Sequence, residues 1–428
     1  MRYQPHTANE IKEMLKSIGA KNVNELYNNV PQEVLLTSFI EGLPMGQSEM
    51  DVEADMQNLA EMNHQTSDGP FFLGAGYYRH HIPATVDYII QRGEFLTSYT
   101  PYQPEVAQGT LMAIFEFQSY IAKLTGQEIA NASMYDGATS LAEAVLMANR
   151  IQKSKKTSVC IPEPLHPHYK ETLSTYLTHT EIKLDAHVSE NTSSIIVQYP
   201  NFHGEIPNLE KYRKICDDNN ALLIVCINEI VSLGLLPAPS CADIVVGEAQ
   251  SIGIPLSYGG PALGFFACKK EYIRQLPGRI VGKTEDTSAK RSFVLTLNTR
   301  EQHIRRDKAT SNICTNEGLC ALAFTVHVSL LGETGFKKLA LVNHAKAQTL
   351  ANELKNIKGI KVLNKTYFNE FVIQTETDVS KIITHLQESG IIAGYEIAPQ
   401  KMLVCATEMT SPQDIQQFTH ALSNAINL

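Results

Sequence analysis

Residues 222–229 read Leu-Leu-Ile-Val-Cys-Ile-Asn-Glu, the most apolar run of the sequence followed at once by an amide and a carboxylate. A short apolar run that ends at polar residues is typical of a strand buried on both faces. A side chain at the carboxyl end of such a strand points into the crevice where open α/β sheets bind ligands. Glu229 is therefore a candidate site residue, although an acid that caps the next helix would fit the same pattern.

Similar apolar runs occur on both sides of this one, and helical patterns separate many of them. The predicted strands are 129–134, 157–161, 180–184, 194–198, 222–227, 242–246 and 263–268. The predicted helices between them include 140–153, 167–177 and 208–219. Strands that alternate with helices form a mostly parallel sheet with both faces covered. We therefore predict one large α/β domain with a seven-stranded sheet.

The flanking sequence has different patterns. Before the sheet, helices are expected at 8–18, 83–92 and 105–124, the first beginning with the capping box Thr7-x-x-Glu10. After a long basic segment, 269–308, the sequence predicts a linking helix at 316–355, strands at 359–363, 368–374 and 401–405, and helices at 377–389 and 411–426. We predict an N-terminal helical arm (1–85), the large α/β domain (86–315), and a linking helix with a smaller α+β C-terminal domain (316–428).

Composition excludes several classes of protein. The chain has 428 residues and a formal net charge of −9, which disfavours nucleic-acid binding. No apolar run approaches the roughly 18 residues of a membrane span, and no secretory signal follows the first Met. The eight cysteines are scattered without a C-x-x-C pair, which favours reduced core thiols over disulfides or a zinc site. We expect a cytoplasmic protein with no metal, nucleic-acid or membrane partner.

The stretch Met134-Tyr-Asp-Gly-Ala-Thr-Ser140 lies between a predicted strand and a predicted helix. Small residues at a helix N-terminus leave backbone N–H groups free, and such groups can bind a phosphate. The candidate cradle residues are Asp136, Gly137, Ala138 and Thr139. A simpler alternative is a turn at Gly137 followed by the capping box Ser140-x-x-Glu143.

Two loops offer further candidates. In Leu165-His-Pro-His168, His166 follows a predicted strand and could stack on an aromatic ligand or act as a base, although the pattern of a lone histidine favours an exposed turn residue. Two histidines spaced i, i+2 also suggest a metal, but no second ligand cluster supports one. In Tyr258-Gly-Gly-Pro261, the paired glycines allow a close backbone approach or a simple turn.

A basic segment and an aromatic loop complete the set of candidates. The basic residues of the segment 298–312 are Arg300, His303, Arg305, Arg306 and Lys308, with Ser311 and Asn312 at its end. Arginine forks suit carboxylates and phosphates, whereas Glu301 and Arg305 at i, i+4 would also fit a solvated helix face. The loop residues are Tyr99, Thr100, Tyr102 and Gln103, a rigid amphipathic contact surface or a loop packed on itself.

A large α/β domain with a phosphate cradle, a histidine loop, a strand-end acid and a glycine turn resembles the aspartate-aminotransferase-type (fold type I) fold of pyridoxal phosphate (PLP)-dependent transferases. Such enzymes need a phosphate cradle, a group that stacks on the cofactor ring, an acid for the pyridine nitrogen and a Schiff-base lysine.

Longer stretches make the resemblance specific. They are Phe72-Leu-Gly-Ala-Gly-Tyr-Tyr78, Tyr99-Thr-Pro-Tyr-Gln-Pro-Glu-Val-Ala-Gln-Gly109, Ala130-Asn-Ala-Ser-Met-Tyr-Asp-Gly-Ala-Thr139, Gln198-Tyr-Pro-Asn-Phe202, Pro277-Gly-Arg-Ile-Val-Gly282 and 299–316. With them the whole chain resembles the glycine-cleavage P-protein (glycine decarboxylase) family, and within it the separate first (α) subunits of the two-subunit form.

The resemblance implies a complex that decarboxylates glycine through PLP and passes the aminomethyl group to the lipoyl arm of a carrier H-protein, as a glycine dehydrogenase (aminomethyl-transferring). It also implies a second (β) subunit that carries the Schiff-base lysine, in an α2β2 heterotetramer. In this chain Gln250 stands at the expected lysine position, and no lysine lies between Lys214 and Lys269. Glutamine has no nucleophilic amine. Glu229 also departs from the Asp that the family implies.

We therefore expect PLP on the partner β subunit and a vestigial site in this chain, which alone would be inactive. Residues 99–103 and 299–312 are expected to face that partner or its cofactor pocket. Three alternatives stay open. They are a stand-alone PLP enzyme that uses another lysine such as Lys283, a non-catalytic structural or regulatory pseudoenzyme subunit, and a generic α/β binding protein.

Overall fold

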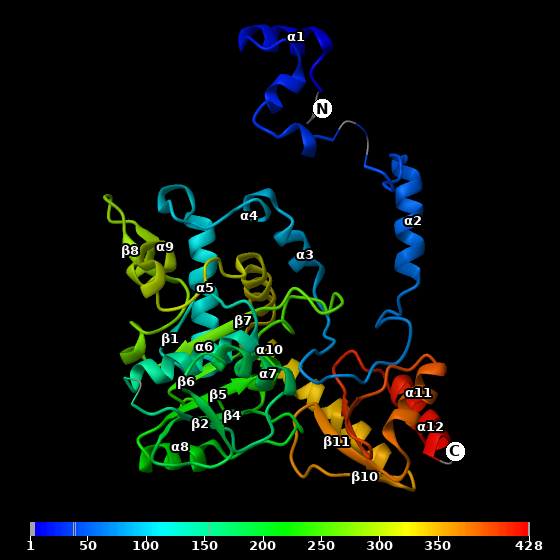
Figure 1. Ribbon diagram of the computed structural model, residues 1–428. Helices are drawn as coiled ribbons and strands as arrows, with labels where there is room; N and C mark the ends of the chain where they lie inside the picture. The colour runs from blue at the N-terminus through cyan, green and yellow to red at the C-terminus, as the bar shows by residue number, and fades with distance from the viewer. Residues whose placement is uncertain (1–4, 37, 39, 154, 427–428) are drawn as a thin grey trace. The chain divides into compact units, whose positions relative to one another are not determined.

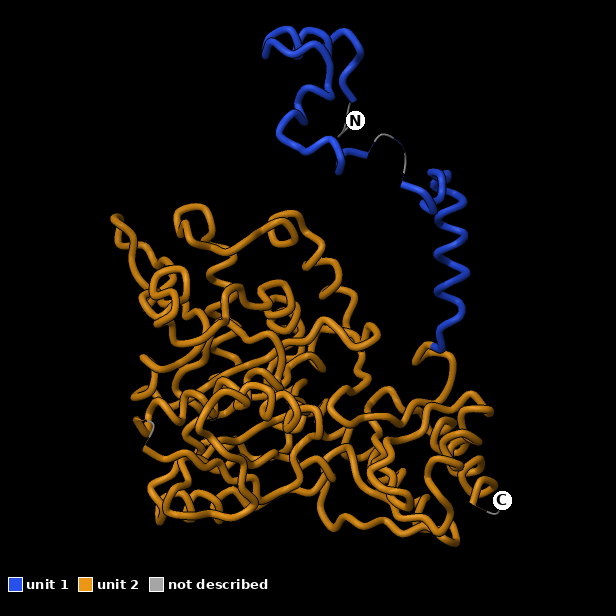
Figure 2. The backbone as a smooth tube through the Cα atoms, in the orientation of Figure 1, with its two compact units in different colours: residues 1–64 blue, residues 65–428 orange. Residues whose placement is uncertain are grey.

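The computed structural model describes residues 5–36, 38, 40–153 and 155–426. Contacts divide the chain into two compact units, residues 1–64 and residues 65–428 (Figure 2). The predicted boundaries at residues 85 and 315 stay predictions.

The first unit is helical, as predicted. Its elements are α1 (Ala8–Ser17), η1 (Val23–Tyr27), η2 (Gln32–Val34) and α2 (Glu49–Glu61). The capping box at α1 is confirmed, because the Thr7 hydroxyl accepts from the Glu10 N–H at 3.3 Å while the Glu10 carboxylate accepts from the Thr7 N–H at 2.7 Å. None of the described residues of this unit is buried, so its helices have no core of their own.

The second unit is built around a seven-stranded sheet (Figure 1). The strands are β1 (Ile129–Ala130), β2 (Ser158–Cys160), β3 (Lys183–Asp185), β4 (Thr192–Gln198), β5 (Leu222–Ile227), β6 (Ile244–Glu248) and β7 (Gly264–Cys268). Their order is β1-β7-β6-β5-β4-β2-β3, and the pairs from β3 to β6 are parallel, whereas β7 is antiparallel to both its neighbours. The predicted mostly parallel seven-stranded sheet is confirmed.

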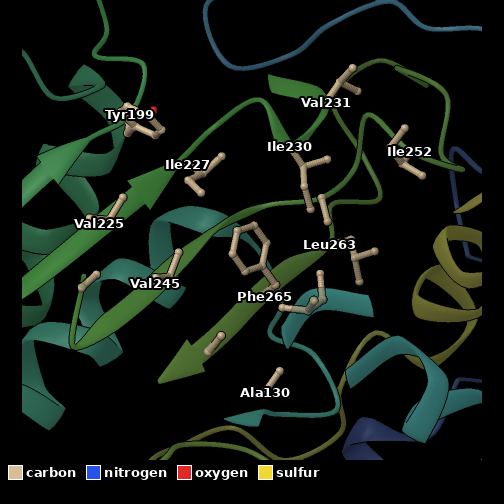
Figure 3. Packing of buried hydrophobic residues seen from close by; sticks show 14 of the residues in the cluster. Ala130, Tyr199, Val225, Ile227, Ile230, Val231, Val245, Ile252, Leu263 and Phe265 are labelled. Carbon is tan, nitrogen blue, oxygen red and sulfur yellow. The ribbon is translucent and has the colours of Figure 1, made fainter. Parts of the chain in front are cut away.

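Helices cover both faces of the sheet. The helices that precede and connect the strands are α3 (Ala84–Ile90), α4 (Gly93–Leu96), η3 (Pro104–Val106), α5 (Gln108–Thr125), α6 (Gly137–Ile151), α7 (Pro167–Leu177), α8 (Leu209–Asp218) and η4 (Ile230–Gly234), and of these α5, α6, α7 and α8 pack on the sheet. One face presents alternate strand residues such as Val225, Ile227, Val245 and Phe265 to a core shared with α5 and α8 (Figure 3). The other presents Ile224, Cys226, Val246 and Phe266 to α6 and α7. Burial on both faces explains why these strands are apolar throughout.

Several predicted boundaries were wrong by three residues or more: β3 begins at Lys183 and not at 180, α5 begins at Gln108 and not at 105, and two further errors lie near the site. The expected strand 129–134 ends at Ala130, because the regular ladder with β7 is interrupted where the Ala132 N–H donates to the Arg279 carbonyl at 2.8 Å, and only an isolated bridge between Met134 and Gly264 follows. Helix α6 begins three residues before the predicted start, because its N-cap is Asp136, whose carboxylate accepts from the Thr139 N–H at 2.6 Å. The alternative capping box at Ser140 is therefore excluded.

The basic segment 269–308 contains a hairpin that the sequence analysis missed. Strands β8 (Ile280–Glu285) and β9 (Arg291–Thr296) pair in an antiparallel two-stranded sheet. The remaining elements of the segment are η5 (Lys270–Tyr272), η6 (Asn298–Arg300), α9 (Gln302–Arg305) and η7 (Arg306–Lys308). Neither strand has a period-two pattern, because β8 (Ile-Val-Gly-Lys-Thr-Glu) has its apolar residues at one end and β9 (Arg-Ser-Phe-Val-Leu-Thr) has them in one central run.

Helix α10 (Gly318–Lys355) leads into the C-terminal part, as predicted, and bends at Gly332, whose φ of 60° and ψ of −175° are not helical. Helix α10 is long and apolar enough to cross a membrane, but core helices of soluble proteins also have this length and composition. Nearly half of its most apolar stretch is buried inside the protein. The predicted absence of a membrane partner stays a prediction.

The C-terminal elements are β10 (Ile360–Val362), β11 (Glu370–Thr375), α11 (Val379–Glu388), β12 (Tyr395–Ala398), β13 (Lys401–Cys405) and α12 (Pro412–Ile426). Their four strands form an antiparallel sheet of order β10-β11-β13-β12. The sequence analysis did not predict β12. Its residues are exposed or half-buried at the sheet edge, so it lacks the apolar run that marks the other strands.

The close packing of β5 against β6 yields a first prediction. A Cβ added at Gly247 would collide with the Ile227 carbonyl oxygen on β5. Gly247→Ala should therefore lower the free energy of unfolding by about 1–3 kcal/mol. Gly109→Ala is the matched control, because nothing lies within 4 Å of an added Cβ there and helix α5 should gain about 0.5–1 kcal/mol. Urea unfolding of the purified chain measures both, and equal stability of the two variants would contradict the prediction.

Candidate functional site

The carboxyl ends of the parallel strands bring several predicted residues together. Glu229 follows β5, Gln250 follows β6, and Asp136 caps α6 beside them. A segment that the sequence analysis assigned no role, residues 74–80, contacts this edge through Ala75, Tyr78 and His80. We call residues 74–80 the plug segment.

The predicted phosphate cradle binds a side chain of the chain itself. The Gly137 N–H donates to the Glu248 carboxylate at 3.0 Å, and the second oxygen of Glu248 accepts from the N–H groups of Gln250 (3.0 Å) and Leu263 (2.7 Å). Glu248 is 4% exposed, and burial raises its pKa to about 7 despite these three hydrogen bonds. Ala138 and Thr139 form the first turn of α6, and Thr139 contacts only the capping Asp136.

At the expected lysine position, Gln250 has a structural role. Its side-chain amide donates to the carbonyls of Ile254 (2.7 Å) and Pro255 (3.0 Å), which fixes the turn after β6. The residue is 1% exposed. Because the Gln250 amide is buried and bonded to two backbone carbonyls, this side chain holds the turn and supplies no nucleophilic amine.

The strand-end acid Glu229 is paired with a histidine. His80 contacts Glu229 through Nε2 at 2.9 Å and Glu408 through Nδ1 at 2.9 Å. Burial alone would lower the pKa of His80, but the two carboxylates outweigh it and raise the pKa to about 10. Burial would likewise raise the pKa of Glu408, but the hydrogen bond and charge of His80 hold it at about 2. The Asn343 amide also donates to Glu408 at 2.9 Å.

His166 is buried, and both of its ring nitrogens are used. Nδ1 accepts from the His168 N–H at 3.1 Å, so Nε2 carries the proton and donates to the Ala75 carbonyl at 2.7 Å. Burial lowers the pKa of His166, in agreement with a neutral ring. A Cβ at Gly76 would lie 2.9 Å from Nε2, so the plug segment covers this histidine closely.

These residues do not fit PLP. The Gly137 N–H of the cradle binds Glu248, Glu229 binds His80, and the amide of Gln250, at the position where a lysine is expected, is bonded within the turn after β6. The cavity left at this edge, between Tyr78, Asn228 and Glu370, has a volume of about 10 Å³. That volume holds about one water molecule, whereas ligand pockets usually have several hundred Å³.

A larger cavity lies elsewhere in the second unit. It has a volume of about 300 Å³, and Tyr99, Thr100, Asn316 and Glu317 are among its lining residues. Two of the predicted loop residues thus line an open cavity beside the first turn of α10. The other two predicted loop residues, Tyr102 and Gln103, are exposed.

Arg279 joins the aromatic loop to the basic segment. Its guanidinium donates to the Tyr102 hydroxyl at 2.7 Å, to the Thr100 hydroxyl at 3.4 Å and to Glu301 at 3.2 Å. The Tyr102 ring lies 5.2 Å from the His303 ring, edge to face. Arg279 is 2% exposed, and one carboxylate oxygen of Glu301 is buried without a partner among the described residues. The two predicted segments therefore form one polar cluster.

The basic residues divide into two groups. The expectation that Arg300 is a surface cation is wrong, because the residue is buried and its guanidinium donates hydrogen bonds to the carbonyls of Leu276 and Gly278. Arg305, Arg306 and Lys308 are exposed, and no hydrogen bond or ion pair of their side chains is found among the described residues. At the end of the segment, the Ser311 hydroxyl accepts from the Ile313 N–H at 3.4 Å and Asn312 is exposed.

The sequence did not lead to four charged residues of these clusters: His80, Glu248, Arg279 and Glu408. Glu248 follows the predicted strand 242–246 in the same way that Glu229 follows 222–227, so the strand-end argument could have found it. Arg279 lies in the stretch 277–282, which was used only as evidence for the family resemblance. Nothing local indicates His80, because its partners are 149 and 328 residues away in the chain.

The comparisons agree with the resemblance. The family model described as glycine cleavage system P-protein matches residues 1–422. The probable glycine dehydrogenase (decarboxylating) subunit 1 of Sphingopyxis alaskensis is 46% identical over 453 residues, with 100% of both chains covered. A crystal structure of glycine decarboxylase (P-protein) of the glycine cleavage system, in inhibitor-bound form, has a TM-score of 0.93 and 39% identity, and the match covers 99% of this chain and 100% of that chain.

A more distant structure supports the fold alone. Glutamate decarboxylase of Lactobacillus brevis has a TM-score of 0.69 at 10% identity, with 92% of this chain and 96% of that chain covered. The fold is therefore the aspartate-aminotransferase-type (fold type I) fold of PLP-dependent enzymes, as predicted.

The buried His80 provides the prediction of this section. His80→Gln leaves Glu229 and Glu408 without their shared cation, which should cost about 3–5 kcal/mol of unfolding free energy at pH 6.5. Because the pKa of His80 is raised from 6.5 to about 10 in the folded state, this stabilisation is complete below pH 6.5 and disappears as the pH rises through 10.

Denaturant unfolding between pH 6.5 and 10 measures both effects, and the difference between wild type and His80→Gln should shrink across this range. The control is His81→Gln, whose side chain is exposed and whose effect should stay within about 0.5 kcal/mol. A pH-independent difference between wild type and His80→Gln would contradict the charged pair.

Proposed function

This chain belongs to the glycine cleavage system P-protein family, and we propose that it is subunit 1 (α) of a two-subunit glycine decarboxylase. In this proposal the complex, and not the chain alone, decarboxylates glycine. PLP on the partner β subunit supplies the electron sink. The aminomethyl group passes to the lipoyl arm of the carrier H-protein. The complex is an α2β2 heterotetramer in the cytoplasm, a compartment that eight unpaired cysteines favour.

The observation that carries this proposal is the closed strand edge. Gln250 occupies the lysine position, and its amide is bonded within the turn after β6. The stand-alone alternative is disfavoured as well, because Lys283 lies exposed on the β8–β9 hairpin and not at the strand edge. A family member without a reactive amine at the expected place fits a division of labour between two subunits.

The contribution of this chain would come from the other cluster. The cavity beside Tyr99 and Thr100 is open, and Arg279 holds their loop against Glu301. We propose that this face completes the cofactor pocket of the partner. The free cations Arg305 and Arg306 lie on the same segment as Glu301 and suit a carboxylate, such as that of glycine or of an acidic partner surface.

The alternative is a non-catalytic structural or regulatory subunit. The closed strand edge favours it too, since a chain without its own chemistry can still be needed for assembly. Co-expression with the β subunit distinguishes the two. We expect glycine-dependent carbon dioxide exchange only when both chains are present. A β subunit that exchanges carbon dioxide at the full rate without this chain would support the structural alternative.

Borohydride reduction in the presence of PLP tests which chain holds the cofactor. The isolated chain should incorporate no pyridoxyl group, because no lysine lies between Lys214 and Lys269. The complex should incorporate one on the β subunit, as measured by intact-mass spectrometry of each chain. A stoichiometric label on this chain would overturn the proposed division of labour.

The two free arginines yield a further prediction for the complex. Arg305→Ala with Arg306→Ala should lower carbon dioxide exchange by roughly 10-fold to 100-fold, because a hydrogen bond to a charged group is worth about 1.5–3 kcal/mol. The heterotetramer should still form, as judged by its mass in solution. The matched control is Lys361→Ala with Lys365→Ala, two exposed cations at β10 and the loop after it. Full turnover of the arginine variant would contradict a role for these residues.

A further inference from the structure

We propose that side chains of this chain take the place of both polar ends of a cofactor: the Glu248 carboxylate occupies the anion position at the N-terminus of α6, and the His80 ring occupies the cation position on Glu229. The inference goes beyond the proposed function, because it concerns how the isolated chain folds and not what the complex does.

The anion position is defined by three backbone donors from three places in the fold. Gly137 is the first residue of α6, Gln250 follows β6, and Leu263 precedes β7. Their N–H groups converge on the two oxygens of Glu248 at 2.7–3.0 Å. Backbone donors that converge at a helix N-terminus are the usual way in which proteins bind a phosphate. Glu248 satisfies them with a covalently attached anion.

Packing closes the space that a phosphate would need. A Cβ at Gly137 would collide with the Tyr169 hydroxyl, and one at Gly264 with the Asp136 carbonyl. Glu248, bonded to the Gly137 N–H, and Tyr169, packed against the Gly137 Cα, therefore occupy the space beside this residue. The close approach explains why glycine is required at 137 even though no ligand is bound there.

The cation position is filled in the same manner. In PLP enzymes an acid contacts the ring nitrogen of the pyridine. Here the acid is Glu229, and its partner is the imidazole of His80 at 2.9 Å. The Val231 N–H (2.9 Å) and the Asn369 amide (3.5 Å) complete the hydrogen bonds of Glu229. His80 belongs to the plug segment, and the Ala75 carbonyl of the same segment accepts a hydrogen bond from His166 Nε2.

Both replacements lie in one chain, so its folding requires no cofactor. The donors of the cradle and the acid of the ring site would otherwise be buried without partners, at a cost of several kcal/mol each. The two internal partners remove this cost before any ligand or second subunit binds.

Chemical rescue tests the anion position. Glu248→Ala removes a CH₂–COO⁻ group, which acetate matches in size and charge. The experiment is urea unfolding of the full isolated chain at pH 8, above the pKa of Glu248, with sodium acetate replacing sodium chloride at constant ionic strength. Acetate should shift the unfolding equilibrium of the variant about 10-fold toward the folded state at roughly 10 times its dissociation constant.

Glu143→Ala is the matched control, because Glu143 is a buried carboxylate on α6 with one unpartnered oxygen and no contact with the cradle donors. Wild type and Glu143→Ala should respond to acetate less than twofold. A response of Glu248→Ala no greater than that of Glu143→Ala would overturn the proposal.

Two further measurements apply if Glu248→Ala does not fold. Glu248→Gln keeps the volume but turns an amide NH₂ toward a backbone donor, so its unfolding equilibrium should shift at least tenfold toward the unfolded state relative to Glu143→Gln. Equal stability of these variants would overturn the proposal. So would a wild-type chain that pyridoxal phosphate stabilises more than pyridoxal. The stabilities of the Glu248 variants do not depend on the activity of the complex, so on these outcomes the proposed function stands or falls separately.

Discussion

The second unit depends on neutralising buried carboxylates where the parallel strands end. Glu229 follows β5 of the central sheet and Glu408 precedes α12 in the C-terminal part, and the imidazole of His80 lies between the two carboxylates. Burying a charge is tolerated only when it is paired and hydrogen-bonded. The plug segment, the end of β5 and the turn before α12 are therefore held in one arrangement. The hydrogen bonds that the Ala75 N–H and the Tyr78 hydroxyl donate to Glu370 depend on this arrangement.

The fold was largely predictable because its core strands are short apolar runs with helices between them. All seven strands of the central sheet were found, since residues buried on both faces leave an unmistakable pattern at 194–198 and 222–227. The hairpin β8–β9 was missed because its apolar residues lie next to charged and polar ones in a basic segment, and the edge strand β12 was missed because it has little apolar signal. The start of α6 was misplaced, because two capping patterns overlap there and only the backbone decides between them.

The site was predictable in position but not in content. Strand-end reasoning located Glu229, and the small-residue turn located Gly137, yet neither residue indicates its partner. Glu248 binds Gly137 across 111 residues, and His80 binds Glu229 across 149. Such pairings are fixed by tertiary packing and leave no trace in local sequence. Arg300 is a further example, because it lies in a basic run of the sequence but is buried in the structure and bonds two backbone carbonyls.

The self-filled strand edge has a consequence for the cell. An apoenzyme that needs its vitamin-derived cofactor to fold is lost to proteolysis when that vitamin is scarce. A chain whose cradle and acid are already occupied by Glu248 and His80 has no such requirement. On the proposal that these side chains replace the cofactor, the folded chain would not depend on vitamin B6 supply and would accumulate before a PLP-carrying partner is loaded.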